Sequence, residues 1–221
     1  MTATMRANVR QVEIPAGRLI LPGELTLPEE PVGLVAFAHG SGSSRFSPRN
    51  QQVADTMHQS GLGTLLFDLL SEAESQTRAN VFDLSLLAER LIAATIWLGQ
   101  EPDARDLRLG YFGASTGAGA ALIAAAQAGN RIHAVVSRGG RPDLAHEWLP
   151  KVLAPTLLIV GGLDTAVLGL NHLALEQLHC EKRLTVVPGA THLFEEPGTL
   201  ESVSRLARDW FAHYLRAPAA R

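Results

Sequence analysis

The stretch LGYFGASTGAGAALIAAAQA, residues 109–128, decides the fold of this chain. A short apolar run leads into the pentapeptide Gly113-Ala114-Ser115-Thr116-Gly117, and a run of small residues follows it. This G-x-S-x-G pattern is typical of a sharp strand-to-helix turn, in which the glycines keep Cβ atoms from colliding. We therefore predict that Ser115 stands at the tip of such a turn as a candidate nucleophile. The alternative is a glycine-rich turn that binds an anion through its backbone amides.

The same region raises the question of a membrane span. The 22 residues between Arg108 and Arg131 carry no charge, and that length is enough to cross a bilayer. They contain five glycines and several polar side chains, which suit a tight turn in a soluble protein far better. Residues 1–10 hold two arginines and no apolar core, so no secretory signal is predicted. We expect a cytoplasmic protein that does not contact a membrane.

Apolar segments on both sides of this stretch predict the rest of a sheet. Most are continuous apolar runs, as in strands buried on both faces. The predicted strands are 34–38, 64–69, 108–112, 133–137, 156–160 and 184–187, preceded by an antiparallel pair at 9–14 and 18–27. Helical patterns separate them: Ser47-Pro48 begins one that stops at Gly61, Asn80 begins one that ends before Gly99, and residues 200–214 form the last. This alternation predicts an α/β fold of three layers, with a mostly parallel sheet and helices on both faces.

The composition sets limits on domains and partners. The chain has 221 residues, of which 46% are hydrophobic, and a formal net charge of -3. No linker-like segment divides it, so a single domain over 1–221 is expected. Cys180 is the only cysteine, which excludes a disulfide framework or a cysteine-based zinc site. The charge balance gives no reason to expect nucleic acid as a partner.

Two further residues complete a candidate catalytic triad. Asp164 follows the strand 156–160 and His192 follows the strand 184–187, so both are predicted at carboxyl ends of strands, beside Ser115. The chain order Ser115, Asp164, His192 is that of the α/β-hydrolase fold. In such a triad the histidine takes the serine proton and the aspartate orients the histidine.

An oxyanion hole requires two N–H donors. The backbone of Thr116, directly after the nucleophile, is predicted to supply one of them. The glycine-rich loop 39–44 is predicted to supply the other, from Ser41. A plain polar loop is the alternative interpretation of residues 39–44.

Three segments together resemble one branch of the α/β-hydrolases, the dienelactone hydrolase-like family. They are HGSGSSR at 39–45, GASTG at 113–117 and GATHLF at 189–194, with Asp164 in a Gly-Gly-Leu-Asp setting at the family's acid position. The resemblance spans roughly residues 33–214 and implies an esterase or lactonase without a cap domain or cofactor. Founding members of the family use a cysteine nucleophile, whereas this chain has Ser115. That departure favours ordinary carboxylic esters over dienelactone.

Substrate selection is assigned to residues near the predicted site. Arg45 and Arg138 are placed to hold a substrate carboxylate or phosphate. An internal ion pair is the alternative for them, for example Arg138 with Asp143 or Asp164. Trp148 and Phe194 are candidates for the wall of an acyl pocket, although aromatic residues near a site are as often core.

The sequence thus predicts a serine hydrolase that cleaves small or short-chain carboxylic esters, including lactones, through an acyl-enzyme. The expected partner is a small-molecule ester, no metal or cofactor is expected, and a homodimer is left open. The short segment 138–144 leaves no room for a cap domain after its strand. The alternatives are a thioesterase or acyltransferase with the same triad, and a non-catalytic ligand-binding protein of this fold.

Overall fold

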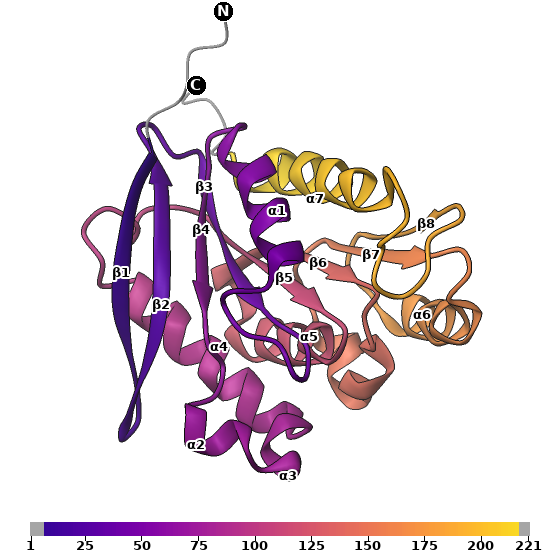
Figure 1. Cartoon of the computed structure of the whole chain (residues 1–221), viewed down its shortest axis with the longest axis horizontal. Coiled ribbons are helices and arrows are strands. Elements are labelled where there is room, and N and C mark those ends of the chain that lie inside the picture. Colours follow the sequence, from indigo (N-terminus) through magenta and orange to yellow (C-terminus); the bar gives the residue numbers. More distant parts are fainter. Residues whose placement is uncertain (1–6, 217–221) are drawn as a thin grey trace, which may run out of the picture.

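A computed structural model describes residues 7–216 of the chain. Its centre is an eight-stranded sheet in the order β1-β2-β4-β3-β5-β6-β7-β8, as Figure 1 shows. The strands are β1 (Ala7–Ala16), β2 (Leu19–Pro28), β3 (Gly33–Ala38), β4 (Leu62–Phe67), β5 (Leu109–Ala114), β6 (Ile132–Arg138), β7 (Thr156–Gly161) and β8 (Lys182–Val187). The two pairings of β2 are antiparallel and all the others are parallel. The predicted fold class is confirmed.

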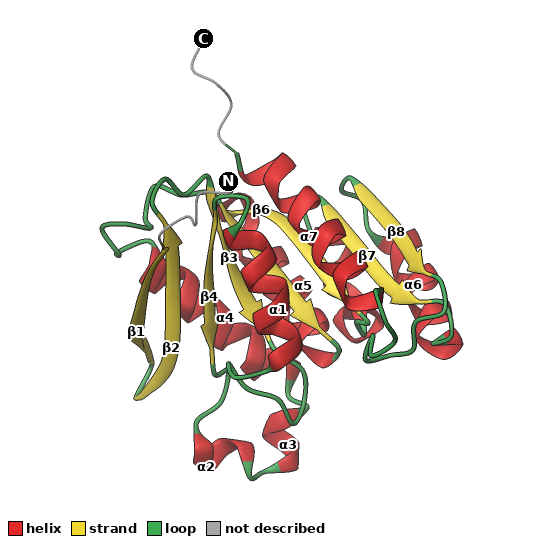
Figure 2. Cartoon of the chain, turned by 45° about the horizontal axis from the view of Figure 1, so that its top comes forward, coloured by secondary structure: helices red, strands yellow, loops and turns green. Residues whose placement is uncertain are grey.

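Helices cover both faces of the sheet, and Figure 2 separates the two layers. One layer holds α1 (Pro48–His58) and α7 (Thr199–Leu215), and the other holds α4 (Leu84–Leu98), α5 (Thr116–Ala128) and α6 (Thr165–Gln177). Shorter elements are α2 (Glu72–Ser75), α3 (Arg78–Val81) and the 3₁₀ segments η1 (Gly129–Arg131) and η2 (Pro142–Lys151). The short helices α2 and α3 project beyond the carboxyl edge of the sheet.

One predicted helix start is wrong. The residue that caps α4 is Asp83, whose Oδ1 accepts a hydrogen bond of 3.0 Å from the Leu86 N–H, and not Asn80. Asn80 lies in α3, where its side-chain amide donates to the Glu74 carbonyl at 3.1 Å. Both residue types favour the cap position, and the one nearer the apolar run forms it.

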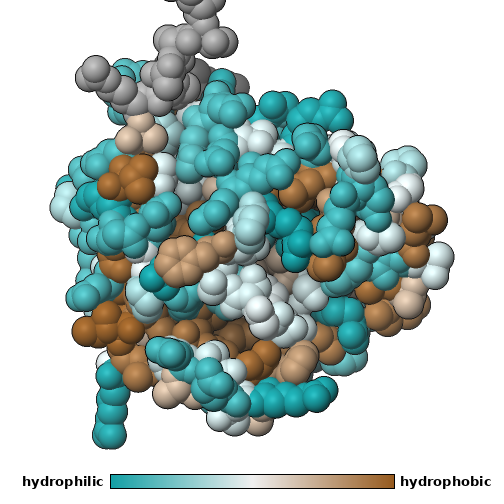
Figure 3. All heavy atoms as spheres, viewed as in Figure 1, coloured by the Kyte–Doolittle hydropathy of each residue, from teal (hydrophilic) through white to brown (hydrophobic). Residues whose placement is uncertain are grey.

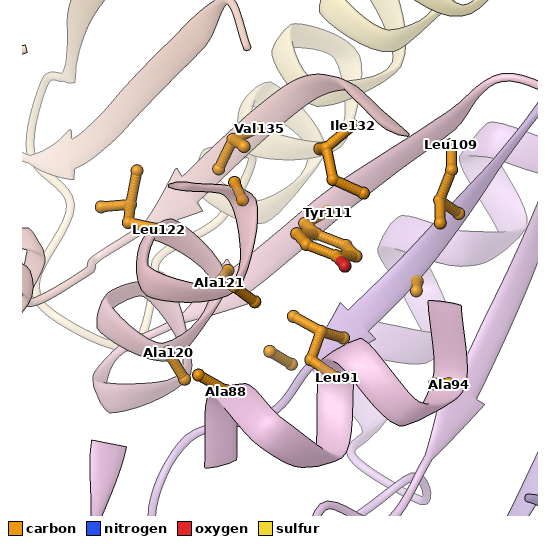
Figure 4. Packing of buried hydrophobic residues seen from close by; sticks show 14 of the residues in the cluster. Ala88, Leu91, Ala94, Leu109, Tyr111, Ala120, Ala121, Leu122, Ile132 and Val135 are labelled. Carbon is orange, nitrogen blue, oxygen red and sulfur yellow. The ribbon is translucent and has the colours of Figure 1, made fainter. Parts of the chain in front are cut away.

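The core lies on both faces of the sheet, and its α4–α5 side appears in Figure 4. Tyr111 of β5 is fully buried there between Leu91 and Ala121, and its hydroxyl is 2.5 Å from the Thr95 Oγ1. Burial raises the pKa of Tyr111, so the phenol stays neutral. The small side chains of α5 allow this helix to lie close to the sheet, which fixes the turn that leads into it.

We expect Gly117→Ala to destabilise the protein strongly. A Cβ at this position would lie 2.2 Å from the Ala38 carbonyl oxygen and 2.5 Å from that of His39, both backbone atoms of the neighbouring strand and loop. Overpacking of this kind costs about 1–3 kcal/mol or more. Urea unfolding should show the loss.

Gly169→Ala is the matched control, because no atom lies within 4 Å of the Cβ it would gain on α6. This change should raise the stability by roughly 0.5–1 kcal/mol, as alanine does in helix interiors. Equal stabilities of the two variants would contradict the close packing of the turn on β3.

Candidate active site

Ser115 lies between β5 and α5 in a backbone conformation that side chains rarely adopt. Its φ is 52° and its ψ is -122°, a strained geometry that costs about 1–3 kcal/mol and is found mainly at functional sites. Hydrogen bonds hold it on both sides: its N–H donates to the Arg138 carbonyl at 3.2 Å, and its carbonyl accepts from the Arg141 N–H at 3.1 Å. The sharp turn expected from the G-x-S-x-G pattern is therefore present.

Asp164 and His192 meet at the same edge of the sheet. Asp164 occupies the cap position of α6 just after β7, and His192 lies in the loop after β8. The Asp164 Oδ2 is 2.7 Å from the His192 Nδ1, and the carboxylate is mostly buried. This contact orients the ring and leaves Nε2 as the nitrogen that can act as a base.

The loop that carries His192 packs beside the serine turn. A Cβ on Gly139 would lie 3.0 Å from the His192 carbonyl oxygen, and Gly139 directly follows the residue that binds the Ser115 N–H. Within residues 7–216, no hydrogen bond joins Ser115 to His192. Such catalytic contacts are often long in proteins without substrate and shorten when substrate binds.

Sequence reasoning missed the hydrogen bonds that close the His192 loop. Thr191 donates two hydrogen bonds to the Glu196 carboxylate, from its N–H at 3.1 Å and from its hydroxyl at 2.6 Å. The hydrogen bond from the Thr191 hydroxyl lowers the pKa of Glu196. Phe194 is 2% exposed with a φ of 56°, so it fixes the loop in the core. The sequence signal for these hydrogen bonds was limited to a Thr and a Glu five residues apart in a segment predicted to be a loop.

The predicted oxyanion loop contacts the serine turn directly. The Ser41 N–H donates to the Thr116 Oγ1 at 2.9 Å, so this donor is occupied in the structure. Thr116 is the first residue of α5, and N–H groups in a first helical turn have no acceptor within the helix. The donors predicted for the oxyanion thus lie side by side, and a bound oxyanion would compete with the Thr116 hydroxyl for the Ser41 N–H.

A cavity of about 450 Å³ opens on the other side of this loop. The loop residues 39–45 form one wall of the cavity, and a Cβ on Gly40 would lie 3.1 Å from the Ser115 Cβ, so the same loop contacts the nucleophile. Ser115, Asp164 and His192 do not themselves line the cavity. Leu70, Val81 and Leu87 give the opposite side an apolar surface, next to α2. In Figure 3, hydrophobic side chains gather on the lower left of the view, where Figure 1 shows the lower parts of β1, β2 and α4.

The two arginines predicted to select substrate differ in surroundings. Arg45 lines the cavity, and both its backbone N–H and its guanidinium bind the Asp68 carboxylate. Arg138 is buried and forms no ion pair within residues 7–216. The ion pairs considered for Arg138 are wrong, because Asp143 binds Arg141 and Asp164 binds His192.

The two aromatic candidates pack as core residues in this structure. Trp148 lies in η2 against the core on the α5 side, with the Lys151 ammonium 4.5 Å from the centre of its ring. Phe194 lies in the core on the opposite face of the sheet, with α1 and α7. Neither residue lines the cavity that loop 39–45 bounds.

His39 fixes the backbone of the oxyanion loop. Its Nδ1 is 3.0 Å from the Gly40 carbonyl, and its Nε2 accepts from the Leu69 N–H at 3.1 Å, which requires the neutral ring. Burial lowers the pKa of His39 below its usual 6.5. Below pH 6.5 the histidine of the unfolded chain is protonated, whereas that of the folded protein stays neutral. The free energy of unfolding therefore falls as the pH drops, by up to about 1.4 kcal/mol per pH unit.

We therefore expect His39→Gln to reduce the loss of stability between neutral and mildly acidic pH. Urea unfolding at several pH values measures it. His58, whose pKa burial also lowers, keeps its own share of the dependence in this variant. A control, His172→Gln at an exposed position on α6, should keep the full slope. An unchanged slope in His39→Gln would contradict the assignment.

Residues 7–216 hold neither a metal-binding cluster of side chains nor a membrane-spanning helix. No group of three or more His, Cys, Asp or Glu side chains there could hold a metal ion. None of the helices in this part of the chain has the length and apolar character to cross a membrane. The uncharged stretch 109–130 is divided between β5 and α5.

Comparisons with known proteins identify the family. No family model matches the chain. A Mycobacterium tuberculosis H37Rv protein named "Putative phosphoribosyl transferase" is 59% identical over 208 residues, a match that covers 94% of this chain and 47% of that protein. The chain thus spans about half the length of that relative.

Solved structures give a fuller match. A dienelactone hydrolase from Anabaena variabilis ATCC 29413 is 55% identical with a TM-score of 0.93, over 95% of this chain and 99% of that one. Est1E from Butyrivibrio proteoclasticus shares the fold, with a TM-score of 0.78 at 17% identity over 92% of this chain and 98% of that one. The extent and identity of the first match show that this chain belongs to the dienelactone hydrolase family of α/β-hydrolases.

Proposed function

We propose that the protein hydrolyses carboxylic esters through a Ser115–His192–Asp164 triad. The observation that carries the proposal is the strained Ser115 turn packed beside a histidine whose Nδ1 lies 2.7 Å from the Asp164 carboxylate. The similar structure of a dienelactone hydrolase, 55% identical to this chain, supports ester hydrolysis.

The reaction proceeds in two halves. When substrate binds, His192 Nε2 accepts the Ser115 proton as the oxygen attacks the ester carbonyl, and Asp164 stabilises the imidazolium that forms. The Thr116 N–H, joined by the Ser41 N–H released from Thr116 Oγ1, stabilises the oxyanion. His192 then protonates the departing alcohol, and in the second half it activates water to release the acid from Ser115.

The adjoining cavity sets an expected substrate size. It measures about 450 Å³, and its apolar side would receive the part of the ester that lies toward α2. Ligand pockets of this volume hold small molecules. We therefore propose small or short-chain esters and lactones as substrates.

Pre-steady-state kinetics with p-nitrophenyl acetate test the acyl-enzyme. We expect a burst of p-nitrophenol equal in amount to the enzyme, followed by slower steady release, because acylation and deacylation are separate steps. Thioester substrates and added alcohols in the same assay separate a thioesterase or acyltransferase from a hydrolase. No turnover of any acyl substrate would contradict the proposal and favour a ligand-binding role.

A further inference from the structure

Arg138 is a buried cation without a partner. It is the last residue of β6 and is 7% exposed. Its Nε has no hydrogen-bond partner, and its guanidinium forms no ion pair anywhere in residues 7–216. Buried charges in proteins are normally paired, because a charge removed from water without compensation is costly. The structure therefore holds a positive charge that lacks its counter-ion.

The backbone of Arg138 lies beside the nucleophile, because its carbonyl accepts the Ser115 N–H at 3.2 Å. Side chains alternate along β6: Val136 lies in the core on the α1 and α7 face, and Ser137 faces Gly140 on the other side. Arg138 therefore returns to the α1 and α7 face. Its register partner on β5 is Ala114, the residue directly before Ser115.

A second cation and a helix terminus lie on the same side. Burial and the positive charge of Arg49, on α1, lower the pKa of Arg138 to about 10. Contacts also bring the two residues near each other: a Cβ on Gly139, directly after Arg138, would lie 3.3 Å from the Phe194 ring, and Glu195, directly after Phe194, binds Arg49. Among residues 7–216, Arg49 pairs with Glu195 alone, at 3.2 Å, and that carboxylate is largely exposed. Arg49 is the second residue of α1, an eleven-residue helix whose N-terminus adds partial positive charge. The Glu195 carboxylate thus pairs with Arg49, and Arg138 has no carboxylate of its own in the described residues.

We propose that Arg138, Arg49 and the N-terminus of α1 form a binding site for a small oxyanion, a carboxylate or a phosphate group. Guanidinium groups bind both in a bidentate manner. At the start of α1, Pro48 has no N–H and the Asn50 N–H donates to the Ser47 Oγ at 3.4 Å, so the Arg49 N–H is the backbone donor that this turn adds to the site. Arg45 does not share this role, because Asp68 already neutralises it. The further step, that the oxyanion belongs to the ester substrate and orients it on Ser115, rests on the proposed function.

Thermal unfolding of the Ser115→Ala protein with inorganic phosphate or acetate, at constant ionic strength, tests the site without turnover. Tm should rise with anion concentration, by roughly 5–10 °C at a hundredfold excess over Kd. Arg138→Met should abolish the shift and should itself raise Tm without anion, because it removes an uncompensated buried charge. Arg49→Gln should reduce the shift.

Arg141→Gln is the matched control, because Arg141 lies three residues away but is bound to Asp143. It should keep the full anion shift. An undiminished shift in both Arg138→Met and Arg49→Gln would overturn the proposal, as would the absence of any shift in Ser115→Ala.

A series of esters tests whether the bound oxyanion belongs to the substrate. All share one leaving group, and their acyl parts are neutral, carboxylate-bearing or phosphate-bearing, which also separates carboxylate from phosphate as the bound group. Wild type should prefer one anionic series over the neutral one by roughly 10–100-fold in kcat/KM, and Arg138→Met should lose that preference while it still cleaves the neutral ester. If wild type and Arg138→Met preferred the anionic esters to the same extent, the anion site would stand, but the claim that it binds the substrate would be overturned. Failure of wild type to cleave any ester, with the anion shift intact, would contradict the proposed function and leave the site standing.

Discussion

Ser115→Ala should lose almost all esterase activity, with kcat reduced by about 10⁶-fold for p-nitrophenyl acetate. Ser115 is held in a strained turn by hydrogen bonds at both its N–H and its carbonyl, so the alanine variant keeps the backbone and loses only the hydroxyl. Without it, His192 has no proton to accept and no acyl-enzyme can form. The variant should unfold at the same temperature as wild type or slightly above it, because residues selected for function often destabilise the fold that carries them.

Ser137→Ala is the control for this result. Ser137 lies near the end of the neighbouring strand β6, is fully buried, and has a hydroxyl without a partner in the described structure. Removal of that hydroxyl should leave kcat within about twofold. If Ser115→Ala and Ser137→Ala hydrolysed the ester equally well, Ser115 would not be the nucleophile.

Asp164→Asn should reduce kcat by about 10⁴-fold while it preserves the fold. The carboxylate accepts a hydrogen bond from His192 Nδ1 over 2.7 Å and thereby leaves Nε2 unprotonated. An asparagine can donate its NH₂ group to Nδ1, which moves the ring proton to Nε2, and a protonated Nε2 cannot accept the serine proton. Steady-state kinetics should show the loss in kcat, with KM changed far less.

Asp143→Asn is its matched control. Asp143 is also mostly buried, yet its partner is Arg141 and it does not contact His192. This variant should lose a little stability and keep kcat within about threefold. A comparable loss of kcat in both variants would indicate a general structural effect and would remove Asp164 from the triad.

The sequence was sufficient for the strands and for the edge of the sheet where the candidate triad meets. The apolar runs are long and continuous, and the carboxyl ends of parallel strands meet at one edge, so residues directly after β5, β7 and β8 had to lie near one another. The start of α4 was less predictable, because Asn80 and Asp83 are both good capping residues; Asp83, nearer the apolar run, forms the cap, while the Asn80 side chain donates to the Glu74 carbonyl.

Contacts between side chains and loops were beyond sequence reasoning. The Ser41 N–H reaches the Thr116 hydroxyl across 75 positions in the sequence, and no local pattern encodes that pairing. The ion pair of Arg45 with Asp68 joins residues 23 positions apart, which is also beyond any local pattern. The position of Arg138 at the end of its strand was predicted, but its lack of an ion-pair partner was not. That lack arises because Asp143 pairs with Arg141 and Asp164 pairs with His192.

Covalent labelling with a fluorophosphonate probe, followed by mass spectrometry of the digested protein, tests the central claim most directly. The probe reacts with a serine whose hydroxyl is activated by a neighbouring base. We predict one adduct per chain, on the peptide that contains Ser115, no adduct in Ser115→Ala, and much slower labelling in Asp164→Asn. Labelling at any other serine, or none on Ser115 in a protein that hydrolyses esters, would contradict this account.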